Sequence, residues 1–394
     1  MPNVRILESI EDTSAADWNA LDLGGRPFLR REFLAACERS GSAAPATGWT
    51  PRHLLAETAG TLVGAMPLYL KSHSWGEFVF DFAWARAYEQ HGLDYYPKLV
   101  SAVPFTPATG PRLLVHPAAD ATQVRGALLQ AARQLARDVG ASGLHALFVG
   151  EEEHDWLSGQ GLLARLDCQF HWHNRQYGSF EDFLGTFTAE KRKKARRERR
   201  RVQEAGIRFV ELHGDELAGD VLEAVYALHA RTFAERGNPP YFSLGFFQEI
   251  ARTMPEALMV KLATLGREPV ACAIFLRGAD TLYGRYWGAA GDFHSLHFEA
   301  CYYQGIDYCI REGLASFEPG TQGEHKVARG FSPTRVWSMH EVRHAAFQAA
   351  IGEYLGRERA HVEAYMDAIR AHVPFRRAEP QANLHPDVGS DLPR

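Results

Sequence analysis

Val63-Gly-Ala-Met-Pro-Leu-Tyr-Leu70 is the second of two apolar segments that meet at a short turn, Ala59-Gly60. A similar pair of segments meets at Gly266, and its second member reads Val270-Ala-Cys-Ala-Ile-Phe-Leu276. Short apolar runs joined by a glycine turn are typical of paired antiparallel strands. Because the two pairs align with each other, the sequence indicates an internal duplication.

Each strand pair is followed by the same further elements. An alanine-rich helix is expected over Ala127–Val139 and a strand over Leu144–Val149, whereas the second copy offers a helix over Leu296–Glu312 and a strand over Leu314–Phe317. Two copies of one layout predict an α+β protein in which mostly antiparallel sheets are flanked by helices.

The length of 394 residues also favours two domains. We place their boundary near Gly178, which gives an N-terminal domain over 1–177 and a C-terminal domain over 178–375. Residues 376–394 contain several prolines and are expected to form a flexible tail.

The composition, with 46% hydrophobic and 23% charged residues, is that of a soluble globular protein. The five cysteines form no CxxC pair, which favours reduced thiols and a cytoplasmic location. Neither a signal peptide nor a transmembrane segment is expected from the hydropathy pattern. His171-x-His173 and His294-x-x-His297 lack a convincing third ligand, so no metal site is predicted.

The run from Lys191 to Arg201 holds nine basic residues in eleven positions, although the net charge of the chain is −5. A helix over 188–205, capped by Thr188 and ended by Gly206, would place Lys191, Ala195, Glu198, Val202 and Ala205 on its inner face. So many like charges favour a phosphate-bearing partner over a merely solvated helix. RNA, such as a tRNA, fits better than DNA because no base-reading motif accompanies the run. The residues expected to contact phosphate are Lys191, Lys194, Arg196, Arg197, Arg199 and Arg200.

The glycine-rich segment from Phe317 to Phe331 gathers several different ionisable side chains: Glu318, Gln322, Glu324, His325, Lys326 and Arg329. Acyl transfer needs such variety, because a site must move a proton and stabilise an oxyanion. A charged surface loop is the alternative interpretation.

Glu299 falls within the apolar stripe of the helix that follows Gly291. A carboxylate on a buried helix face is costly unless it is paired or functional, so both a core ion pair and a role as a base fit this position. The preceding stretch Arg285-Tyr-Trp-Gly-Ala-Ala290 matches a short pattern by which acetyltransferases bind the pyrophosphate of coenzyme A.

A further polar cluster lies in the first half of the chain, in a region rich in proline and aromatic residues. Such a loop either clamps an extended polar substrate or forms a rigid structural element. Its members are Lys71, His73, Glu77, Asp81, Tyr95, Lys98 and Arg112.

Several of these motifs together resemble the FemAB-like proteins of the GNAT superfamily, which are commonly labelled peptidoglycan biosynthesis or recognition proteins. The motifs are His73-Ser-Trp-Gly-Glu-Phe-Val-Phe-Asp81, Tyr95-Tyr-Pro-Lys-Leu99, Pro104-Phe-Thr-Pro107 and Gln322-Gly-Glu-His-Lys-Val-Ala-Arg-Gly-Phe331. The resemblance covers roughly Trp18 to Val373 and implies two tandem GNAT-like domains. The related Fem transferases move an amino acid from aminoacyl-tRNA to an amine of a cell-wall precursor peptide, and this chain lacks their long coiled-coil arm.

The resemblance and the motifs together predict an N-acyltransferase that works by direct attack of an amine on an activated donor. Glu299, Glu324 or His325 would accept the proton, and Lys326 would stabilise the oxyanion. No permanently bound cofactor is expected; the donor is an aminoacyl-tRNA or an acyl-CoA. The residues expected to contact substrates are Lys71, His73, Glu77, Asp81, Tyr95, Lys98, Arg112, Tyr286, Gln322 and Arg329. The alternative is a non-catalytic protein that binds a peptide or RNA.

Overall fold

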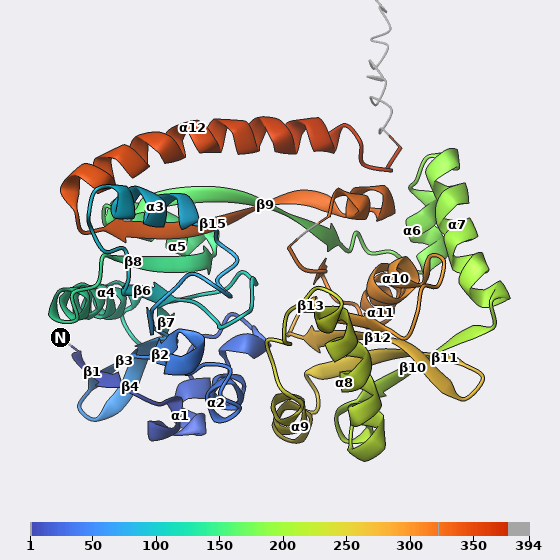
Figure 1. Ribbon diagram of the computed structural model, residues 1–394, viewed down its shortest axis with the longest axis horizontal. Coiled ribbons are helices and arrows are strands. Elements are labelled where there is room, and N and C mark those ends of the chain that lie inside the picture. Colours follow the sequence, from blue (N-terminus) through green and yellow to red (C-terminus); the bar gives the residue numbers. More distant parts are fainter. Residues whose placement is uncertain (1, 322, 377–394) are drawn as a thin grey trace, which may run out of the picture.

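The computed structural model describes residues 2–321 and 323–376, so the expected tail lies almost wholly outside the described residues. Its two halves, residues 2–177 and 178–376, form two lobes side by side (Figure 1). Each lobe contains four antiparallel strands in the same order. These strands are β1 (Asn3–Leu7), β3 (His53–Thr58), β4 (Thr61–Met66) and β7 (Leu114–Val115) in the first, and β10 (Ile207–His213), β11 (Leu258–Leu265), β12 (Glu268–Arg277) and β13 (Thr281–Ala289) in the second.

The second set belongs to an eleven-stranded sheet with the order β10-β11-β12-β13-β14-β9-β15-β8-β6-β5-β2, which runs through both lobes. Its remaining strands are β14 (Ser316–Glu318), β9 (Leu163–His173), β15 (Ser332–Val342), β8 (Gly143–Val149), β6 (Lys98–Ser101), β5 (Tyr69–Lys71) and β2 (Trp49–Pro51). The predicted strand pairs and the predicted mixed α+β class with two copies of one strand layout are confirmed.

Helices cover the sheets in both lobes. They are α1 (Ala15–Asn19), α2 (Arg31–Arg39), α3 (Phe82–Gln90), α4 (Ala121–Asp138) and α5 (Glu151–Gly159) in the first half, and α6 (Phe180–Gly185), α7 (Ala189–Glu204), α8 (Gly219–Ala234), α9 (Leu244–Thr253), α10 (Leu296–Phe298), α11 (Gln304–Arg311) and α12 (Ala345–Arg370) in the second. A π-helical turn, η5 (Glu299–Tyr303), joins α10 to α11, and a 3-10 segment, η6 (Glu324–Arg329), follows β14.

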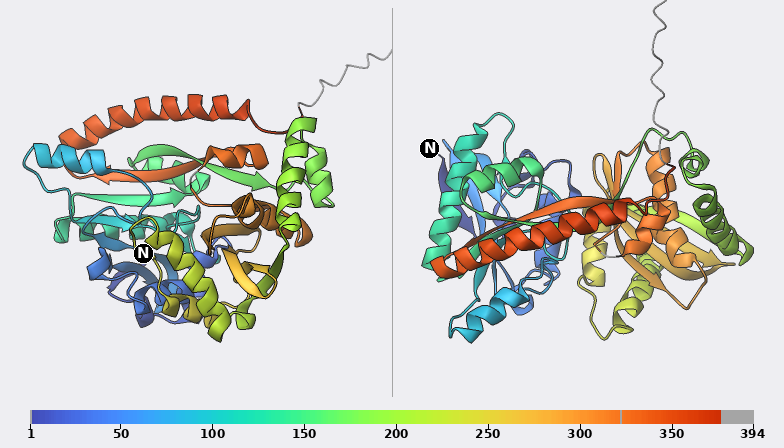
Figure 2. Two further views of the ribbon diagram at one scale, coloured as in Figure 1. Left: turned by 45° about the vertical axis from the view of Figure 1, so that its right-hand side comes forward. Right: turned by 90° about the horizontal axis from the view of Figure 1, so that it is seen from above.

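The C-terminal part of the chain returns to the first lobe. Strand β15 pairs with both β8 and β9, and helix α12 then lies along both lobes (Figures 1 and 2). The boundary near Gly178 stays a prediction, since β15 of the second half packs within the first lobe. Strand β15, the last strand, therefore links the second half of the chain to the first lobe.

The lobes also share a hydrophobic core. Phe33 of α2 packs edge-on against Phe246 of α9, with 5.4 Å between ring centroids, and Phe28 meets Tyr283 at 4.8 Å. All four side chains are buried in one cluster that spans both halves. Since aromatic burial of this kind contributes strongly to stability, the geometry between the lobes is fixed by packing.

Helix α7 forms as predicted, and Ala195, Glu198 and Val202 are its buried residues. Thr188 occupies the cap position, but its side chain makes no capping hydrogen bond, so this predicted detail is wrong. Within the described residues, none of the helices is both long and apolar enough to cross a lipid bilayer.

Candidate active site

A cavity opens where two parallel strands part. Strands β13 and β14 pair only from Thr281 to Tyr283, after which β13 continues to Ala289 with β12 as its only partner among the described strands. The cavity has a volume of about 500 Å³ and lies between this opening and the first lobe. We call it the central cavity; its lining includes Phe78, Phe105, Thr232, Phe233, Arg236, Tyr241, Gly284, Arg285, Tyr286, Trp287, His297, Cys301, Tyr302, Thr321, His325 and Lys326.

Lys326 provides a titratable amine at the wall of the central cavity. Its side chain is only 2% exposed, and its Nζ donates a hydrogen bond of 2.6 Å to the carbonyl oxygen of Gly320. Burial lowers the pKa of Lys326 to about 7. The amine therefore exists in both charge states near neutral pH, as a group that stabilises an oxyanion or moves a proton must.

Two histidines line the same cavity, with ring centroids 6.0 Å apart. Burial lowers the pKa of His297 to about 4, and burial followed by the charges of Lys326 and Arg329 also lowers the pKa of His325. The hydroxyl of Tyr302 lies 2.8 Å from Nε2 of His325 and orients its ring. Both imidazoles are thus uncharged at neutral pH and able to accept a proton.

Aromatic side chains from both lobes form the remaining walls. Phe105 of the first lobe stacks on Tyr241 of the second, with 5.0 Å between centroids. Arg285 holds this contact in place, because its Nη2 donates a 2.6 Å hydrogen bond to the carbonyl oxygen of Phe105. The expected contact residue Tyr286 also lies in this wall.

Gly288 is the glycine within the coenzyme A-like pattern of the sequence, and its position has a packing explanation. A Cβ atom there would lie 2.1 Å from the carbonyl oxygen of Leu228. Helix α8 therefore crosses β13 closely only because this residue is glycine.

Glu299 does not line the central cavity. It is 4% exposed and accepts hydrogen bonds from Gln304 at 2.8 Å and from Arg199 at 3.2 Å. Burial raises the pKa of this carboxyl group, and the Arg199 charge opposes the shift. The expected role as base is corrected to a core ion pair, since the side chain faces helix α7.

Two further expected site residues, Glu324 and Arg329, also lie outside the lining of the central cavity. Glu324 is exposed and accepts a 2.9 Å hydrogen bond from the hydroxyl of Tyr365, outside the central cavity. Arg329 is buried, pairs with Glu198 at 2.8 Å and covers the ring of Phe298 at 3.3 Å. Gln322 lies outside the described residues.

The polar cluster of the first lobe forms a separate buried network. Lys98 is fully buried and pairs with Asp81 and with Glu77, the latter at 2.7 Å, while the hydroxyl of Tyr95 donates to Asp81 at 2.7 Å. The ammonium group of Lys71 lies 3.6 Å from the centroid of the Trp49 ring.

None of the expected contact residues of this network lines the central cavity; they are Lys71, His73, Glu77, Asp81, Tyr95 and Lys98. Of the two earlier interpretations, the closed network fits the rigid structural loop better than the substrate clamp.

Arg112 is also corrected from a substrate contact to a structural residue. It is 1% exposed and donates hydrogen bonds to the carbonyl oxygens of Ala108, Gly110, Pro111 and Leu147. Its side chain links the loop that precedes β7 to Leu147 of β8.

On helix α7 most of the expected phosphate contacts point outward. Lys194, Arg196, Arg197 and Arg200 are exposed, and Lys191 is half-buried. Arg199 differs, because it pairs with Glu299 and covers the ring of Phe180 at 4.1 Å. The wheel predicted from the sequence is therefore correct for Ala195, Glu198 and Val202. It is wrong for Ala205, which is exposed, and for Arg199, which faces the protein, and Lys191 is only half-buried.

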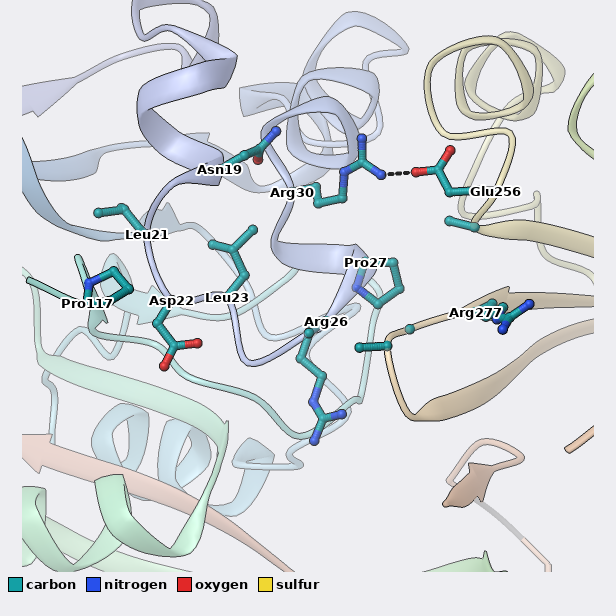
Figure 3. Close-up of a pocket in the computed structure, with 14 residues that line it drawn as sticks. Asn19, Leu21, Asp22, Leu23, Arg26, Pro27, Arg30, Pro117, Glu256 and Arg277 are labelled. Atoms are coloured by element: carbon teal, nitrogen blue, oxygen red, sulfur yellow. Dashed lines mark hydrogen bonds and ion pairs between the residues drawn. The ribbon is translucent and has the colours of Figure 1, made fainter. Parts of the chain in front are cut away.

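A second and larger cavity of about 800 Å³ lies at the junction of the lobes (Figure 3). Its lining is mainly apolar, and its arginines are engaged: Arg30 pairs with Glu256, and Arg277 with Glu312 at 3.3 Å. The described residues that line this groove include no histidine or lysine, so it offers less acid–base chemistry near neutral pH than the central cavity.

Tyr302, Arg236 and His297 were missed or set aside by the sequence interpretation. The π-helical turn at Glu299–Tyr303 changes the angle between successive residues, so a regular helical wheel does not predict how His297 lies relative to the residues after the turn. Among the described residues, no group of three or more His, Cys, Asp or Glu side chains is placed to hold a metal ion.

Comparisons with known structures give remote similarities. A conserved protein of unknown function from Bacteroides thetaiotaomicron has a TM-score of 0.50 at 9% identity, covering 86% of this chain and 99% of that one. FemX has a TM-score of 0.49 at 12% identity, covering 79% of this chain and 92% of that one. A tandem GNAT protein from the clavulanic acid biosynthesis pathway has a TM-score of 0.46 at 13% identity, covering 87% of this chain and 98% of that one. No curated protein matches the chain.

The family comparison is more specific than the structural ones. The FemAB-like family model, described as peptidoglycan biosynthesis/recognition, matches residues 9–377. This match spans both lobes, the central cavity and helix α12. The chain therefore belongs to the FemAB-like family.

Proposed function

We propose that this protein is an N-acyltransferase and that the central cavity is its transfer site. The observation that carries this proposal is the pair formed by His325 and Lys326 where β13 and β14 part. One group is an uncharged base and the other an amine that titrates near neutral pH. Membership of the FemAB-like family supports the same reaction class.

In the proposed reaction an amine attacks the carbonyl carbon of an activated ester or thioester. The new carbon–nitrogen bond forms as His325 accepts the proton of the amine, and the carbon–oxygen or carbon–sulfur bond then breaks. Tyr302 orients His325, and the protonated form of Lys326 stabilises the tetrahedral oxyanion. The proton on His325 finally passes to the leaving group, so the base is regenerated.

The donor is proposed to be an aminoacyl-tRNA or an acyl-CoA, and the acceptor an amine-bearing small molecule or peptide. Both donors carry phosphates, which the exposed cations of helix α7 would attract. No ion pair within the described residues engages Lys194 or Arg197.

A transfer assay tests the proposal with two conservative variants. His325→Gln is expected to lower the single-turnover rate by about 100-fold or more, because it removes the base. Glu299→Gln is the matched control and is expected to keep the rate within a few-fold, since Glu299 lies outside the cavity. Full activity in His325→Gln, or loss only in Glu299→Gln, would contradict the assignment.

A further inference from the structure

Apart from tyrosines and a cysteine, the ionisable side chains that line the central cavity are basic. Its lining contains Arg236, Arg285, Lys326, His297 and His325, whereas no aspartate or glutamate occurs among the described residues that line it. An ammonium group that entered the cavity would therefore meet no carboxylate there. Burying a charge without a partner is costly, and nearby like charges increase the cost.

Three carboxylates on the elements around the cavity, Glu299, Glu324 and Glu318, lie outside its lining. Glu299 is paired with Arg199, and Glu324 accepts the hydroxyl of Tyr365. Glu318 is buried at the end of β14, where it faces the charges of Arg26 and Arg285. None of the three lines the cavity, so none replaces the missing partner.

Aromatic rings also attract cations, but at one ring of the cavity wall, Tyr286, the protein's own Arg285 already takes this role. The guanidinium group of Arg285 lies 5.8 Å from the centroid of the Tyr286 ring and 5.5 Å from that of Phe28. The ring of Tyr286 also packs against His229, with 4.6 Å between centroids. An incoming ammonium would thus compete with a fixed guanidinium for the same electron-rich face.

The same walls suit an uncharged chain. Phe78 and Phe105 of the first lobe face Phe233, Tyr241 and Trp287 of the second around this cavity. Burial of apolar surface against such rings contributes favourably to binding, and no group of the chain needs an ionic partner.

We propose that the acyl group bound in the central cavity has an apolar, preferably aromatic, chain and carries no free ammonium group beside its carbonyl. This inference rests on the proposed function and specifies its donor. Among the two donor classes it favours an acyl thioester, or an aminoacyl group whose amine is blocked, over an ordinary aminoacyl ester.

Two stable amides that differ by one amino group test the inference directly. Calorimetry on the full chain would compare 3-phenylpropanamide with L-phenylalaninamide, at a pH where the second carries its charge. The uncharged amide is expected to bind at least about tenfold more tightly. Equal affinity, tighter binding of phenylalaninamide, or binding of neither amide would overturn the inference.

A variant locates the binding in the cavity. Thr232→Trp on α8 adds a ring at the cavity wall and is expected to abolish binding of 3-phenylpropanamide, whereas Ala227→Trp, on an exposed position of the same helix, should leave it unchanged. Unchanged binding in Thr232→Trp would overturn the assignment.

The inference and the proposed function fail separately. If the protein binds the uncharged amide tenfold more tightly but transfers no acyl group, the proposed enzyme activity is refuted and the inferred class of ligand stands. If the protein transfers a phenylalanyl group as fast as a 3-phenylpropanoyl group, the proposed enzyme activity stands and the inferred class of ligand is refuted.

Discussion

Arg329 and Glu198 form a buried ion pair of 2.8 Å that connects η6, beside the central cavity, to the inner face of helix α7. Glu198 also accepts a 2.7 Å hydrogen bond from the hydroxyl of Tyr303. The only acid within the basic run thus faces inward and holds the helix on the protein. The outward face of α7 and the segment that carries His325 and Lys326 are joined by this contact.

Loss of this contact is expected to destabilise the fold. Glu198→Gln leaves the guanidinium group of Arg329 buried without its counter-ion, which costs about 3 kcal/mol of unfolding free energy. Urea denaturation measures the change. Glu204→Gln, at the exposed pair with Arg200, is the control and should cost less than about 1 kcal/mol. Similar losses in both variants would contradict a buried role for Glu198.

Glu318 is expected to make stability depend on pH. Burial raises the pKa of its carboxyl group from 4.5 to about 7. Between these values the unfolded chain loses the proton while the folded chain keeps it, so the unfolding free energy falls as the pH rises from about 4.5 to about 7. Glu318→Gln should lack this contribution. Parallel stability curves for the two proteins across this range would refute the expectation.

Arg112 is expected to stabilise the first lobe and to have no part in ligand binding. Arg112→Met removes hydrogen bonds to four carbonyl oxygens that are then left without their donor, at a cost of about 3 kcal/mol or more. The melting temperature should fall, while the affinity of the folded variant for 3-phenylpropanamide stays unchanged. A stable variant with weakened binding would return Arg112 to the substrate-contacting residues.

The outer face of α7 is expected to attract polyanions. The double variant Lys194→Glu/Arg197→Glu should lose retention of RNA in a gel shift without a change in melting temperature, because both side chains are exposed. Arg208→Glu/Arg267→Glu makes the same change of charge at exposed positions of the same half and is the control. Equal retention by the two double variants would show that the basic run has no special role.

The duplication could be predicted from the sequence because apolar strands and glycine turns are local signals. β3–β4 and β11–β12 appear where the apolar runs predict them. The return of β15 to the first lobe could not be predicted, since an eleven-residue strand carries no local mark of its partners.

Only part of the candidate site could be predicted, because some of its residues belong to a local motif and others depend on packing. The segment that ends at Phe331 does supply His325 and Lys326 to the central cavity. Glu299 was assigned to the same cleft from a regular helical wheel, but the π-helical turn and the pairing with Arg199 give it another environment. Polar residues at buried positions signal a constraint, and only the packing reveals whether that constraint is catalytic or structural.

A crystal structure of the full chain with 3-phenylpropanamide tests the central claim most directly. The account predicts the phenyl ring between the aromatic walls of the central cavity and the amide oxygen within hydrogen-bonding distance of Lys326 or His325. Density for the amide in the junction groove of Figure 3, with the central cavity empty, would contradict it.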